Sequence, residues 1–131
     1  MNLKARIVDA SQIVGVSSFE NAICEYLYKE LTAMGFDSYI DENGNIFGEI
    51  ACDVPGAKTL LLEAHIDQVG LIVSGIDQDA RIRFTTIGGV DERILCGMEV
   101  ELQTNPPMYG VVGPVSSEKK RENPQNRGIA D

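Results

Sequence analysis

The feature that most constrains this chain is a nearly continuous apolar run, Thr59 to Ala64, which ends directly before the single histidine, His65. A run that is apolar at successive positions, rather than at alternate ones, predicts a β-strand covered on both faces. Such strands occur inside α/β sheets, where helices cover each face. The sequence therefore predicts an α/β fold with a polar, histidine-containing segment at the carboxyl end of a buried strand.

Two helices are predicted before this strand. Apolar residues at helical spacing over residues 3–14 predict a short helix that ends at Gly15. A second series over residues 19–34 predicts a longer helix that packs on the core and ends at Gly35. Ser17, followed three residues later by Glu20, has the form of a capping box at the start of this second helix.

Strand patterns account for most of the remaining chain. Residues 39–50 predict a β-hairpin, because two apolar stretches flank the turn-forming pair Asn43-Gly44. Beyond residue 70, the sequence predicts strands separated by turns at 70–76, 81–87, 98–103 and 109–112. Apolar and polar residues alternate at 81–87 and 98–103, which predicts half-buried antiparallel strands there. The change near residue 73 predicts a mixed α/β part followed by an all-β part. Residues 116–131 are polar and aperiodic, and we expect a mobile tail there.

Composition and charge exclude several classes of function. The 131 residues suit one compact domain, or one and part of a second, and 44% are apolar, enough to expect a buried core. The net charge is −9 and no basic stripe is present, which argues against nucleic acid as a partner. The amino-terminal residues lack the apolar stretch of a signal peptide or a membrane span, so we expect a cytoplasmic protein that does not bind membranes.

The three cysteines, Cys24, Cys52 and Cys96, are widely spaced and contain no C-x-x-C pair. This pattern favours reduced, mostly buried thiols over a disulfide framework or a zinc knuckle.

The candidate metal-binding and catalytic side chains lie in residues 63–70, Glu-Ala-His-Ile-Asp-Gln-Val-Gly. Residues two apart in an extended segment point to the same side, so His65 and Asp67 can act together. A neutral imidazole binds zinc or cobalt, and a neighbouring carboxylate can orient the ring. The alternative is a hydrogen-bonded polar histidine beside a turn aspartate, because H-x-D is short and two residues cannot complete a four-coordinate site. Cys52 or Cys96 could add a ligand, although their spacing does not support it.

Five short segments follow one another in an order that is known from a single family. They are Val16-Ser-Ser-Phe-Glu, Asp41-Glu-Asn-Gly-Asn-Ile, Ala64-His-Ile-Asp-Gln-Val-Gly, Thr86-Ile-Gly-Gly-Val-Asp and Tyr109-Gly-Val-Val-Gly. They resemble the SGxE, D-x-x-GN, AHxDEVG and IGG segments, and the strand after them, of the M42 (glutamyl aminopeptidase) family of metallo-aminopeptidases. The resemblance extends from about residue 3 to residue 113.

This resemblance implies that His65 ligates one of two divalent ions, zinc or cobalt, and that Asp67 is a catalytic carboxylate that orients this ligand. In such sites the metals polarise the peptide carbonyl and generate hydroxide, while a glutamate is the general base. It also implies that residues 1–72 are the amino-terminal part of the peptidase domain. Residues 73–115 would be a β-rich, barrel-like dimerisation segment. Peptide substrates and a homo-oligomer are expected.

The chain also departs from the family pattern. Gln68 replaces the glutamate that usually follows the motif aspartate, which we expect to be a mild change because that residue is not a ligand. The bridging aspartate, the general-base glutamates, a further carboxylate ligand and a second histidine have no counterpart here. We therefore expect a truncated aminopeptidase that is inactive alone.

Two other functions are alternatives to this one. A non-catalytic self-association module derived from the family would explain the missing ligands. A carbohydrate-active enzyme would need two carboxylates at a defined separation, and no such pair can be recognised.

Overall fold

The computed structural model describes residues 2–114, and the chain divides into two compact units, residues 1–88 and 89–131. The predicted tail, residues 116–131, lies outside the described residues. The predicted domain boundary between residues 72 and 73 concerns a complete enzyme and stays a prediction.

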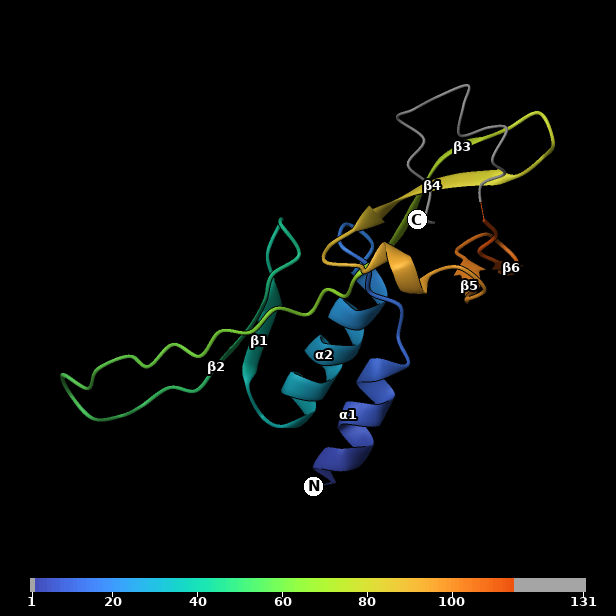
Figure 1. The fold of residues 1–131 in the computed structure, drawn as a ribbon. Helices are drawn as coiled ribbons and strands as arrows, with labels where there is room; N and C mark the ends of the chain where they lie inside the picture. Colours follow the sequence, from blue (N-terminus) through green and yellow to red (C-terminus); the bar gives the residue numbers. More distant parts are fainter. Residues whose placement is uncertain (1, 115–131) are drawn as a thin grey trace. The chain divides into compact units, whose positions relative to one another are not determined.

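Both predicted helices are present in the first unit (Figure 1). Helix α1 spans Leu3–Ser11 and α2 spans Asn21–Ala33. Helix α2 ends as predicted at Gly35, where a φ of +89° allows the chain to reverse. The amides of Gly35 and Phe36 then donate hydrogen bonds to carbonyls of the last helical turn, which satisfies two of the acceptors left free there.

The predicted hairpin is formed by β1 (Asp37–Ile40) and β2 (Ile46–Glu49), which pair antiparallel. Tyr39 lies opposite Phe47, and their rings stack with centroids 4.8 Å apart. The hairpin packs closely on α2, since a Cβ added at Gly48 would lie 3.3 Å from a methyl carbon of Leu31.

Antiparallel pairing continues after residue 69, as the alternation predicts. In the first unit, β3 (Gly70–Ile76) pairs with β4 (Ile82–Ile87). In the second unit, β5 (Glu99–Leu102) pairs with β6 (Met108–Val111), after a short 3₁₀ helix at Glu92–Ile94. The fold is thus mixed α/β with small antiparallel sheets. Within residues 2–114 the strands form three separate two-stranded sheets and no closed sheet, so a barrel-like segment is not confirmed.

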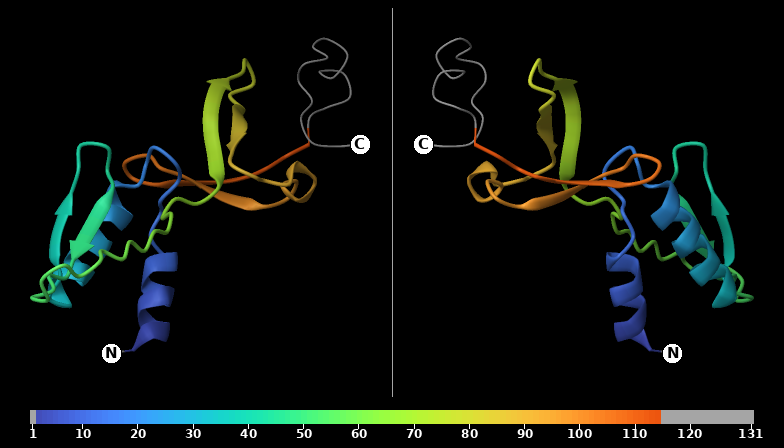
Figure 2. Two further views of the ribbon diagram at one scale, coloured as in Figure 1. Left: turned by 90° about the vertical axis from the view of Figure 1, so that its left-hand side faces the viewer. Right: turned by 90° about the vertical axis from the view of Figure 1, so that its right-hand side faces the viewer.

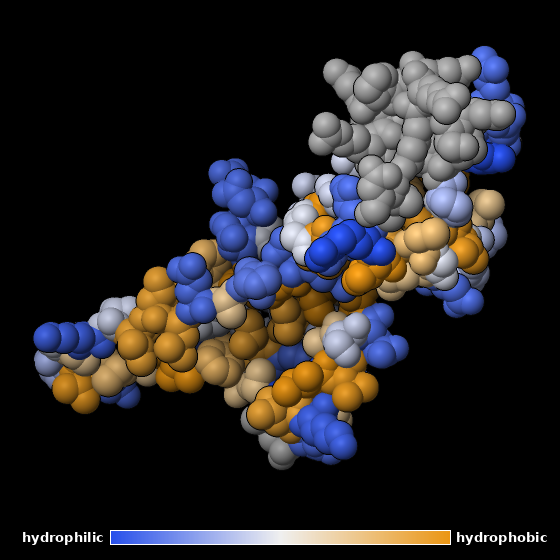
Figure 3. Space-filling model, in the orientation of Figure 1, coloured by the Kyte–Doolittle hydropathy of each residue, from blue (hydrophilic) through white to orange (hydrophobic). Residues whose placement is uncertain are grey.

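The central prediction about residues 59–64 is wrong for this structure: they form no strand. The segment runs as an extended trace without an arrow in each view of the ribbon (Figure 2). Leu60 and Leu62 are 81% and 84% exposed. A strand needs a neighbour to pair with, and no strand among residues 2–114 pairs with this segment. Figure 3 shows the result, with apolar atoms exposed where Figure 1 draws this segment.

The buried core is smaller than the composition predicts. The buried apolar residues are Ile23 and Cys24 in the first unit, and Leu95 and Val112 in the second. All three cysteines are free, but Cys52 and Cys96 are exposed, so the expectation of mostly buried thiols is wrong. None of the helices between residues 2 and 114 has the length and apolar character that a membrane crossing requires.

Candidate functional site

The segment that contains His65 and Asp67 is held against the linker between α1 and α2. The amide of Gln68 donates to the carbonyl of Gly15 at 2.8 Å, and Val16 and Gln68 form a parallel β-bridge. The Gln68 side chain adds a bond from Nε2 to the carbonyl of Ile13 at 3.1 Å. Two backbone segments about 50 residues apart in sequence are thereby joined beside the candidate site.

Two glycines allow this close approach. A Cβ at Gly70 would lie 2.6 Å from Cγ2 of Val16, closer than real Cβ contacts come. A Cβ at Gly15 would lie 2.8 Å from Cγ2 of Ile23, which is buried on α2. A larger residue at Gly70 would push Val16 of the linker away from this segment, and one at Gly15 would push the linker away from α2.

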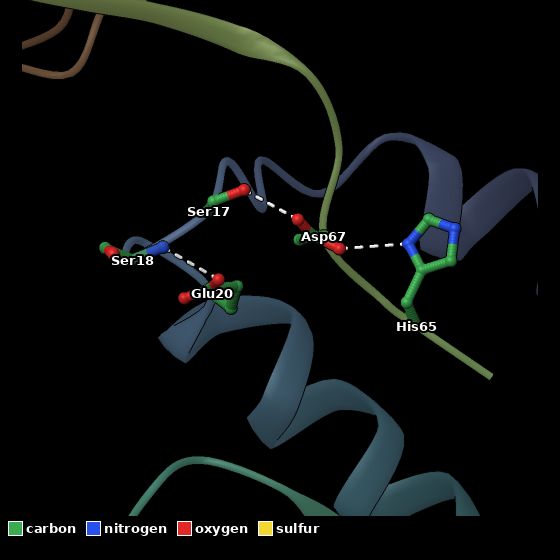
Figure 4. A network of polar contacts seen from close by, with 5 residues as sticks. All are labelled: Ser17, Ser18, Glu20, His65 and Asp67. Carbon is green, nitrogen blue, oxygen red and sulfur yellow. Dashed lines mark hydrogen bonds and ion pairs between the residues drawn. The ribbon is translucent and has the colours of Figure 1, made fainter. Parts of the chain in front are cut away.

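The linker brings Ser17 into a polar network with Asp67 and His65 (Figure 4). The Ser17 hydroxyl donates to Oδ2 of Asp67 at 2.6 Å, and Oδ1 of Asp67 lies 2.9 Å from Nδ1 of His65. The i, i+2 spacing thus places the histidine and the aspartate together, as the sequence predicts. Hydrogen bonds from Ser17 and then from His65 hold the pKa of Asp67 below its usual value. The His65 side chain is 87% exposed, so it is available to a ligand.

The predicted capping box is wrong, and the Ser17 side chain bonds to the site instead of capping the helix. Glu20 is the N-cap residue of α2 and makes no side-chain capping bond to the helix. Its carboxylate instead accepts from the amide of Ser18 at 2.7 Å, in a turn where Ser18 has a φ of +69°. Ser17 is therefore free to bond Asp67, 50 residues later. Sequence reasoning had only the local capping pattern and so missed this contact.

The described residues offer one position for a metal ligand rather than a complete site. Within residues 2–114, no three His, Cys, Asp or Glu side chains are grouped closely enough to hold an ion. Cys52 and Cys96, considered above as extra ligands, are exposed and belong to no such group. His65 itself fits the chemistry of a ligand, since a carboxylate on Nδ1 leaves Nε2 facing away from that contact.

Known proteins resemble this chain in both fold and sequence. The fold is similar to part of a peptidase. A structure of the TET1 peptidase of Pyrococcus horikoshii, which can assemble into a tetrahedron or a large octahedral shell, matches with a TM-score of 0.76 and 27% identity. The match covers 99% of this chain and 38% of that one. The sequence matches the M42 glutamyl aminopeptidase family over residues 44–130. The chain belongs to this family.

Curated relatives agree with this assignment. The glutamyl aminopeptidase of Lactococcus lactis is 30% identical over 79% of this chain and 29% of its own length. The lysyl aminopeptidase of Pyrococcus furiosus is 30% identical over 89% of this chain and 34% of its own length. The chain therefore spans about a third of the length of these relatives.

Proposed function

We propose that this chain provides the amino-terminal part of a metal-dependent aminopeptidase that removes amino-terminal residues from peptides. The observation that carries the proposal is the pair formed by Nδ1 of His65 and Oδ1 of Asp67, 2.9 Å apart, within the part of the chain that matches the M42 family. The free cysteines fit a reducing compartment, so we place the protein in the cytoplasm.

His65 would hold a zinc or cobalt ion through Nε2, and Asp67 would fix the orientation of the ring. A bound divalent ion polarises a peptide carbonyl and lowers the pKa of water, which supplies a nucleophile at neutral pH. The contribution of this chain is narrower: Asp67 accepts a hydrogen bond from Nδ1 and so keeps the lone pair of Nε2 available.

The chain alone is proposed to be inactive, because one imidazole and one carboxylate leave an ion mostly hydrated. The purified 131-residue chain is expected to show no turnover of aminoacyl-anilides with added zinc or cobalt. Turnover that is lost in His65→Ala would contradict inactivity, and would mean that neighbouring subunits or unrecognised residues complete the site.

Absence of turnover does not by itself establish a peptidase, so a second experiment places the chain in a complete enzyme. Residues 1–113 would replace the matching part of the Lactococcus lactis glutamyl aminopeptidase. We expect a folded chimera to hydrolyse aminoacyl-anilides and to lose this activity in His65→Ala. A folded chimera without activity would contradict the proposed function.

A second candidate function is self-association without catalysis. It is favoured by one observation, the exposure of large apolar side chains along residues 60–62. A homo-oligomer is expected under both proposals, whereas activity of the chimera is expected only under the first.

A further inference from the structure

We propose that Ser17 is a positioning residue: through Asp67 it holds His65 in the tautomer that leaves Nε2 free to bind a divalent metal ion. The inference rests on the proposed role of His65 as a metal ligand. It assigns a second residue, Ser17 of the linker between α1 and α2, to the orientation of His65.

The contacts of Asp67 determine which ring nitrogen of His65 carries the proton. An ionised carboxylate only accepts hydrogen bonds, so both contacts of Asp67 require a donor on the other side. The Ser17 hydroxyl donates to Oδ2, and Nδ1 of His65 must carry the proton that faces Oδ1. A neutral imidazole protonated at Nδ1 has its lone pair on Nε2.

The hydrogen bond from Ser17 keeps the Asp67 side chain in place. The His65 side chain is almost fully exposed, so neighbouring side chains do little to fix its ring. Its orientation depends on Asp67, whose own side chain is 41% exposed and can rotate unless it is held. The 2.6 Å bond from Ser17 engages the oxygen that His65 does not use, and so restrains rotation of the carboxylate.

Backbone contacts position Ser17, and its side chain does not cap helix α2. The bridge between Val16 and Gln68 and the bond from the Gln68 amide to Gly15 bring the linker to Asp67 without the Ser17 side chain. Helix α2 has Glu20, not Ser17, as its N-cap. Loss of the Ser17 hydroxyl should therefore leave the fold intact and change the site.

The test uses nuclear magnetic resonance on the full ¹⁵N-labelled chain. Because His65 is the single histidine, its two ring nitrogens give the chain's only imidazole signals. In alkaline buffer, wild type is expected to show the form protonated at Nδ1. Ser17→Ala should shift the signals toward a mixture of tautomers, as Asp67→Asn should. Ser17→Thr, which keeps a hydroxyl, should restore the wild-type signals.

Ser18→Ala is the matched control, because it makes the same change one residue away, where the backbone amide, not the hydroxyl, donates a hydrogen bond to Glu20. It should leave the ring signals unchanged. If Ser17→Ala does not fold, as judged by its backbone amide spectrum, Ser17→Cys replaces the hydroxyl with a weak donor and provides the same comparison. Wild-type signals in a folded Ser17→Ala or Ser17→Cys chain, or a wild-type ring protonated at Nε2, would overturn the inference.

Zinc addition to the same samples separates this inference from the proposed function. Ser17→Ala is expected to weaken zinc binding at His65 by up to about tenfold, the lower end of the effect of removing partners of metal ligands. Ring signals that respond to zinc in no variant would overturn the metal role of His65. The tautomer comparison would then still decide whether Ser17 orients the ring.

Discussion

Gln68 shows how a single residue can depart from the family pattern for a structural reason. The sequence predicts only a mild change, because the usual glutamate is not a ligand. In the structure the amide group of Gln68 donates to the Ile13 carbonyl, a bond that a glutamate carboxylate cannot make. Gln68 therefore helps to join the linker to the segment that carries Asp67.

Gln68→Glu is accordingly expected to lower the free energy of unfolding by more than about 1 kcal/mol, the typical net value of the one hydrogen bond that it loses. It would also place a negative charge beside a carbonyl oxygen. Gln68→Met is the matched control, since it removes the bond but adds no charge. Urea unfolding should rank wild type above Gln68→Met and Gln68→Met above Gln68→Glu. Equal stability of wild type and Gln68→Glu would contradict this role.

Residues of the candidate site differ in how well the sequence predicts them. His65 and Asp67 are two apart, so local geometry is enough to place them together. Ser17 is not predictable in this way, because its contact with Asp67 depends on the tertiary bridge between Val16 and Gln68. Its local pattern with Glu20 even favours a different structure, a helix cap.

At the scale of elements, the sequence predicts those whose stabilising contacts are local. Helix α2 and the β1–β2 hairpin are examples, since their turns and partners lie within the same stretch of chain. The segment at residues 59–64 has the composition of a strand but no partner strand among residues 2–114. Composition predicts that a segment can be a buried strand, but a strand also needs a neighbouring strand to pair with. The relatives are about three times longer, and their additional residues can include such a neighbour.

The stability of the β1–β2 hairpin is expected to depend on pH through Asp41. The pKa of Asp41 is lowered by the side chain of Asn45 and by the amides of Asn45 and Asn43, which donate to its carboxylate. A lowered folded-state pKa means that this stabilisation is complete above the unfolded value, about 3.9. It is lost as the pH falls through the lower folded value.

Ring signals of Tyr39 and Phe47 can follow this loss during an acid titration. The hairpin should stay paired down to about pH 4 and loosen below it. Asp41→Ala should remove the transition, whereas Asp53→Ala, an exposed loop aspartate, should leave it in place. A transition centred above the ordinary aspartate pKa would contradict the assignment.

Across the whole molecule, many large apolar side chains of the described residues are exposed, and exposed apolar surface favours association. The segment at residues 60–62 is the most exposed part of this surface. An extended apolar segment with unpaired backbone groups can pair with another chain. We therefore expect self-association, in keeping with the oligomeric state of the Pyrococcus horikoshii peptidase.

Sedimentation velocity provides the measurement. Wild type should form oligomers, and Leu61→Lys should shift the distribution toward monomer, because the added charge opposes burial of the segment. Leu3→Lys makes the same change at another exposed leucine, on α1, and should have little effect. A monodisperse wild-type monomer would contradict this prediction.

We propose that His65 is a metal ligand in a site that the described residues do not complete, and calorimetric titration with zinc measures this binding. The titration would use a Cys52→Ser/Cys96→Ser background, so that exposed thiols do not bind the ion. Zinc is expected to bind weakly, and His65→Ala is expected to abolish the binding. Tight binding, or binding that is unchanged in His65→Ala, would contradict this proposal.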